Sequence, residues 1–257
     1  MSSPTFTQKL AAEAFGTAIL VFIGAGSVPL TVFLTGSQPF GSAELSTISF
    51  AFAFAIMAAV YSVGHISGCH INPAVTLALL ATRKIDGQTA VGYIGAQLVG
   101  AIGGALLTYG ILIGNDPQTL GLGSVGVNAN AGLPIGVLAE VIGTAILVFT
   151  VFGVAVDGRA PSGFAGIIIG FIVYGIIILV GPITGSALNP ARQIGPVLVE
   201  AVTGFTNTGA RFGELWVYIV GPIAGGLVGA FAYLFIGQQR TASVASGAVP
   251  ERAREAA

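Results

Sequence analysis

The chain has 257 residues, of which 54% are hydrophobic and only 7% charged, and its mean hydropathy is +0.92. An ordinary soluble domain has about 25% charged residues, so this composition places the chain in a lipid bilayer. A net charge of -1 offers no basic face to nucleic acid, and a single cysteine excludes an internal disulfide and a cysteine-rich metal site.

Six apolar runs are long enough to cross a hydrocarbon core of about 30 Å, which needs roughly 20 helical residues. They cover residues 10–33, 45–64, 88–113, 134–156, 163–181 and 215–236. The first run is too long for a signal peptide and contains Glu13. We therefore expect an all-α membrane protein with a single domain over 1–237 and a polar, disordered cytoplasmic tail over 238–257.

The positions of Lys and Arg in the short loops predict the orientation. Arg83 and Lys84 follow the second run and Arg159 follows the fourth. The loops at 35–44 and 114–133 contain neither Lys nor Arg. We therefore expect a multi-pass protein of the cell membrane with both termini on the cytoplasmic side.

The two halves of the chain resemble each other. Residues 12–22 read Ala-Glu-Ala-Phe-Gly-Thr-Ala-Ile-Leu-Val-Phe, and residues 139–149 read Ala-Glu-Val-Ile-Gly-Thr-Ala-Ile-Leu-Val-Phe. The repeats extend over about 8–113 and 134–237 and contain three runs each. Because three is an odd number, the two copies insert with opposite orientations and are related by a pseudo-twofold axis in the membrane plane.

Two polar segments at membrane depth give the strongest functional signal. Asn72-Pro73-Ala74 follows the second run, and Asn189-Pro190-Ala191 follows the fifth. Neither segment leaves room for another crossing, so each is a re-entrant loop that feeds a half-helix, with Asn as the N-cap and Pro in the first turn. The inverted repeat brings the two N-termini together near the midplane. Irregular backbone survives at this depth only if protein buries it or it lines a watery cavity.

These residues resemble the aquaporin, or major intrinsic protein, family, and most of all its archaeal and bacterial water channels. The resemblance rests on the two Asn-Pro-Ala motifs, on Arg192 after the second motif and on the repeated Ala-Glu-x-x-Gly-Thr, and it covers about 8–237. It implies a homotetramer in the lipid bilayer with one pore per subunit. We expect passive passage of water and small neutral solutes, with no cofactor, bound metal or nucleic-acid partner.

The resemblance also gives roles to individual residues. Asn72 and Asn189 would donate hydrogen bonds into the lumen, where two positive half-helix ends repel cations and orient water so that a proton wire is interrupted. Backbone carbonyls would line the pore at Gly68, Cys69, His70, Gly185, Ser186 and Ala187. A narrower selectivity filter would contain Phe52, Ile177, Ser186 and Arg192.

The predicted filter departs from that of dedicated water channels, which usually have His where Ile177 stands. We therefore expect a wider and less polar filter that excludes protons and ions and leaves passage of glycerol open. A dedicated glycerol facilitator is the alternative, although such proteins usually have Asp after the arginine and this chain has Gln193.

The remaining ionisable residues bear on the competing classes. Glu13 and Glu140 occupy matching positions, which favours buried acceptors that hold the loop backbones over proton carriers. His70 is expected to bond within its loop and His65 to lie at the cytoplasmic mouth, in preference to a metal pair. A secondary transporter also uses inverted repeats, but it needs a coupling site, and only Arg192 and the two glutamates are ionisable at membrane depth. A membrane enzyme would need a nucleophile and base, which are missing.

Overall fold

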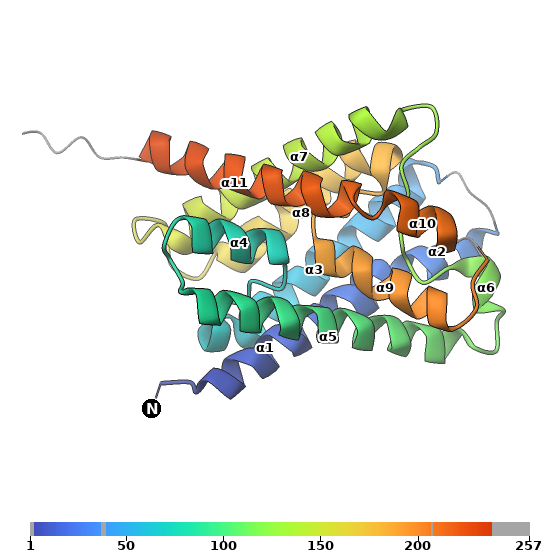
Figure 1. The fold of residues 1–257 in the computed structure, drawn as a ribbon, viewed down its shortest axis with the longest axis horizontal. Helices are drawn as coiled ribbons and strands as arrows, with labels where there is room; N and C mark the ends of the chain where they lie inside the picture. The colour runs from blue at the N-terminus through green and yellow to red at the C-terminus, as the bar shows by residue number, and fades with distance from the viewer. Residues whose placement is uncertain (1–2, 37–39, 207, 238–257) are drawn as a thin grey trace, which may run out of the picture.

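The computed structural model describes residues 3–36, 40–206 and 208–237, and every regular element in this part of the chain is a helix (Figure 1). In chain order the elements are α1 (Phe6–Ile19), the π-helix η1 (Leu20–Ala25), α2 (Ser27–Thr35), α3 (Ser42–Ser67), α4 (Pro73–Ala81), α5 (Gly87–Leu112), α6 (Pro117–Leu120), α7 (Gly132–Val151), the π-helix η2 (Phe152–Val156), α8 (Ala165–Thr184), α9 (Pro190–Val202), α10 (Thr208–Glu214) and α11 (Val217–Gly237). The tail predicted over 238–257 lies outside the described residues.

Six helical stretches in the described residues are long and apolar enough to cross a membrane, which confirms the predicted fold class. They are Phe6–Thr35, Ser42–Ser67, Gly87–Leu112, Gly132–Val156, Ala165–Thr184 and Thr208–Gly237. The last stretch starts earlier than the sequence indicated, because the short helix α10 precedes α11. The single-domain boundary at residue 237 stays a prediction.

The half-helices α4 and α9 lie end to end in the middle of the molecule. They have 9 and 13 residues, so at about 1.5 Å per residue neither can cross a membrane. Their N-termini face each other at the centre and their C-terminal ends run to opposite ends of the bundle (Figure 1). The start of α1 and the end of α11 lie at the same end as the end of α4. This is the arrangement that an inverted repeat of three spans produces.

Glycines bring the first and last spans of each repeat into backbone contact. A Cβ on Gly100 of α5 would lie 2.1 Å from the carbonyl oxygen of Ala14 in α1. A Cβ on Gly225 of α11 would lie 2.2 Å from the carbonyl oxygen of Val141 in α7. No side chain fits in either place, so these helix pairs approach as closely as small residues permit.

The loop between η2 and α8 is fastened to the last turns of α11. Arg159 forms a salt bridge with Asp157 and also donates a hydrogen bond to the carbonyl oxygen of Gly237 (3.0 Å). The Tyr233 hydroxyl donates to Asp157 (2.6 Å). The hydrogen bonds from Arg159 and then from Tyr233 hold the pKa of the Asp157 carboxyl below its usual range. These contacts fix the loop beside one end of the bundle.

Candidate functional site

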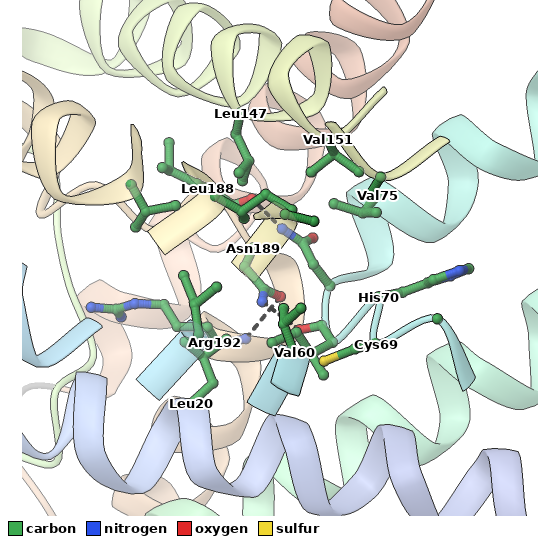
Figure 2. A pocket seen from close by; sticks show the side chains of 18 of the residues that line it. Leu20, Val60, Cys69, His70, Val75, Leu147, Val151, Leu188, Asn189 and Arg192 are labelled. Carbon is green, nitrogen blue, oxygen red and sulfur yellow. Dashed lines mark hydrogen bonds between the residues drawn. The ribbon is translucent and has the colours of Figure 1, made fainter. Parts of the chain in front are cut away.

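A cavity of about 350 Å³ lies inside the bundle, and both Asn-Pro-Ala loops form part of its wall (Figure 2). Most of the remaining wall consists of aliphatic side chains. Lys84, Ile85 and Val156 border the cavity beyond the end of α4. Leu20 and Leu147, which occupy matching positions in the two repeats, line it next to the loops (Figure 2).

Each loop contains two non-glycine residues with left-handed backbone. Cys69 and Ile71 have φ angles of 51° and 44°, and Ser186 and Leu188 have φ angles of 52° and 55°. Such residues cost on the order of 1–3 kcal/mol each, so surrounding contacts have to hold them in place. The matching angles show that the two loops adopt the same irregular conformation.

The carboxyl group of Glu13 holds the first loop. It is fully buried and accepts hydrogen bonds from the backbone N–H groups of His70 (2.9 Å) and Ile71 (2.8 Å). The side chains of Ser67 and Gln97 also donate to it, each at 2.7 Å. Four donors that would otherwise be buried without partners are thus satisfied by one side chain.

Glu140 holds the second loop in the same way. It is fully buried and accepts hydrogen bonds from the backbone N–H groups of Ala187 (2.9 Å) and Leu188 (2.7 Å) and from the Thr184 hydroxyl (2.6 Å). The position that corresponds to Gln97 is Pro222, which has no side-chain donor. Glu140 therefore has one donor fewer than Glu13.

The two asparagines connect the loops to each other. Each Oδ1 caps its own half-helix by accepting from the backbone N–H two residues on, at 2.8 Å for Asn72 and 3.0 Å for Asn189. The Asn72 amide donates to the carbonyl oxygen of Leu188 (2.9 Å), and the Asn189 amide donates to that of Ile71 (2.8 Å). Because an amide nitrogen has two hydrogens, each asparagine keeps one donor that can face the cavity. Sequence reasoning missed this reciprocal bonding.

The predicted filter contains a contact between an arginine and an aromatic ring at the start of α9. Phe52, Ile177, Ser186 and Arg192 all line the cavity and are at most 5% exposed. The Cζ of Arg192 lies 5.1 Å from the centre of the Phe52 ring. The Arg192 Nε and the Ser186 Oγ have no hydrogen-bond partner among the described residues. Two buried polar groups are thus left free for a molecule inside the cavity.

A loop segment that the sequence did not single out holds Arg192. The Nη1 of Arg192 donates to the carbonyl oxygen of Gly123 (2.8 Å), whose backbone is left-handed with a φ of 86°. Gln193 bonds both the N–H (3.0 Å) and the C=O (2.8 Å) of Val125, and Glu200 accepts from the Ser124 hydroxyl (2.6 Å). A backbone carbonyl leaves no side-chain pattern, so no signal in the sequence pointed to this contact.

The other predicted site residues divide into two groups. Gly68, Cys69, His70, Ser186 and Ala187 line the cavity. Gly185 is not part of its wall, and a Cβ added to Gly185 would lie 2.4 Å from Val125. His70 Nδ1 lies 3.2 Å from Thr76 Oγ1, whereas His65 is exposed and away from the cavity.

An apolar six-span bundle with an inverted repeat and a narrow internal passage between two re-entrant loops is an α-helical membrane channel. The family model described as "Major intrinsic protein" matches residues 1–233, and the chain belongs to this family.

Named relatives and a solved structure agree with that assignment. The protein called Aquaporin AqpM from Methanothermobacter marburgensis is 42% identical, over 90% of this chain and 98% of that protein. Aquaporin NIP1-1 from Oryza sativa is 37% identical, over 91% and 76%. The X-ray structure of the aquaglyceroporin from Plasmodium falciparum superposes with a TM-score of 0.78 and 27% identity, over 89% of this chain and 96% of that one.

The position of Cys69 leads to a test with mercury. Its side chain lines the cavity (Figure 2), and it is the one cysteine of the chain. A mercuric ion bound to the thiol would obstruct a passage about one water molecule wide. Mercuric chloride should therefore abolish most osmotic water flow through the parent protein in vesicles. The Cys69→Ala variant is the control and should conduct water unchanged in the same reagent. Inhibition that persists in this variant would show that the thiol is not the target.

Proposed function

We propose that the cavity belongs to a passive pore that conducts water, admits glycerol and similar small neutral solutes, and excludes protons and ions. The observation that carries this proposal is the meeting of Asn72 and Asn189 across the cavity, each at the N-terminus of a half-helix. Two donors and two positive helix ends therefore point at one place in an apolar passage.

This arrangement supports the exclusion of protons. A water molecule at the asparagines has to present its oxygen to the free amide hydrogens, so its own hydrogens point away toward the two exits. It cannot then accept a proton from a neighbouring water on either side. Backbone carbonyls of the two loops would accept hydrogen bonds from the waters above and below.

The composition of the filter supports a wider solute range than water alone. Arg192 and Ser186 supply polar groups to the filter, whereas Phe52 and Ile177 supply an apolar wall. Such a wall can contact the carbon backbone of glycerol while its hydroxyls bond to the polar groups. Relatives named aquaporins and a neighbour titled an aquaglyceroporin are consistent with both solutes.

A secondary transporter has less support. Among the described residues the ionisable groups that line the cavity are Lys84, His70, Cys69 and Arg192. Glu13 and Glu140 lie behind the loops and are occupied by loop hydrogen bonds. No carboxyl group that could carry a coupling ion therefore borders the passage in the described part of the chain.

The setting of the pore is also part of the proposal. Arg83, Lys84 and Arg159 lie in the two loops at the end where α4 ends, which supports a cytoplasmic location for that end and for both termini. The filter then faces the outside of the cell membrane. The family resemblance supports a homotetramer with a pore in each subunit.

Light scattering by proteoliposomes tests the function. Vesicles that contain the protein should shrink faster than empty vesicles under an impermeant osmolyte. Under a glycerol gradient they should then re-swell faster than empty vesicles. Shrinkage at the rate of empty vesicles would overturn the proposal, and saturable, ion-dependent uptake would favour a transporter.

Removal of the Arg192 charge should admit protons. Two unit charges 4 Å apart repel each other by about 4 kcal/mol at an effective dielectric constant of 20, and Arg192→Val loses this barrier. Proton leakage under a pH gradient with valinomycin should rise, by up to about three orders of magnitude if this barrier alone limits it, while water still flows. Arg192→Lys keeps the charge and is the matched control. Equal leakage from parent and Val variant would contradict the role of Arg192.

A histidine in place of Ile177 should narrow the filter and make it more polar. The Ile177→His variant is expected to lose most glycerol permeability and a smaller share of water permeability. Ile177→Val keeps an apolar side chain and should leave glycerol passage intact. A parent protein that excludes glycerol as strictly as the His variant would refute a wide filter.

A further inference from the structure

Gly24 lies directly against the ring of Phe52. A Cβ added to Gly24 would lie 2.5, 2.7 and 2.9 Å from the Cδ1, Cε1 and Cγ atoms of that ring. Atoms do not approach a Cβ this closely in real proteins, so Phe52 occupies the space that any side chain at Gly24 would need. The backbone of Gly24 is helical, and it is therefore space that requires glycine here.

The ring that fills this space is part of the proposed filter. Phe52 is 5% exposed and lines the cavity, and one of its faces carries the Arg192 guanidinium at 5.1 Å. The ring therefore sits between the first span and the charged side of the filter. Its distance from Arg192 depends on how far it can withdraw toward Gly24.

The second repeat has the opposite distribution of volume. The counterpart of Gly24 is Val151, as Ala12 corresponds to Ala139. Ile169 stands twenty residues before Asn189, as Phe52 stands twenty before Asn72. Val151 and Ile169 both line the cavity, so there two medium-sized side chains take the place of a large one and a glycine. Gly24 also lies within the π-helix η1, whereas Val151 belongs to the regular helix α7.

We propose that Gly24 is a positioning residue for solute selection, because it lets the Phe52 ring withdraw from the passage and thereby sets the width of the filter. This inference rests on the proposed pore function. A side chain at Gly24 pushes the ring toward Arg192 and the lumen. Glycerol, which is wider than water, is then excluded first.

A double-mutant cycle tests the inference. Gly24→Ala should lower glycerol permeability several-fold and water permeability less. Phe52→Leu removes the ring and should raise glycerol permeability. In the Phe52→Leu background, Gly24→Ala should have little further effect on either solute. Gly103→Ala is the matched control, because Gly103 lies in the span α5 with no atom within 4 Å of its added Cβ.

The cycle separates this role from damage to the first span. A merely structural effect of Gly24→Ala would lower water and glycerol permeability in equal proportion and would persist in the Phe52→Leu background. That result, or unchanged permeabilities in Gly24→Ala, overturns the inference while the pore function stands. If the parent protein itself does not conduct water, the pore function fails and the inference fails with it. Melting temperatures of the same four proteins should show the Gly24–Phe52 coupling independently of conduction.

Discussion

The passage depends on two buried carboxyl groups, which accept the backbone hydrogen bonds that a regular helix would otherwise provide. The re-entrant loops cannot bond to themselves as helices do, and a buried backbone N–H without a partner costs about 1–3 kcal/mol. Glu13 and Glu140 accept those N–H groups from behind. With their donors satisfied on that side, residues such as Ile71 and Leu188 can keep left-handed backbone and turn their carbonyl oxygens to the opposite loop.

A short series of contacts connects these carboxyl groups to the filter residues. The held loops present the carbonyls that Asn72 and Asn189 bond, and these amides lock the two half-helices end to end. The second half-helix then places Arg192 in its first turn, where Gly123 holds the guanidinium from the outside. The Phe52 ring lies next to this guanidinium and packs against Gly24. Arg192 and Phe52 are thus each positioned by a glycine that does not itself line the cavity.

Most of the fold could be predicted because hydropathy, repeats and capping residues are local signals. The six spans and the Asn-Pro first turns of α4 and α9 are examples of features that such signals specify. Contacts that depend on backbone carbonyls could not be predicted, since any residue has a carbonyl, and Gly123 and Ile71 are of this kind. Leu20 and Leu147 could have been found by matching the repeats, because they are equivalent positions on the cavity wall. Gly24 could not be singled out from the sequence, which has 39 glycines, because only its packing against the Phe52 ring distinguishes it.

The reciprocal asparagine bonds bear on how the chain is assembled during synthesis. Asn72 and its partner carbonyl at Leu188 are 116 residues apart. At about 5–20 residues per second, a ribosome needs roughly 6 to 23 s to supply that carbonyl after Asn72 has been made. During this interval a folded first loop would have to keep its shape without the second half of the chain. Glu13 can provide that support, since its donors Ser67 and Gln97 both belong to the first repeat and are made well before Leu188. The second loop is synthesised when all residues of the first repeat are present, and Glu140 holds it with one donor fewer.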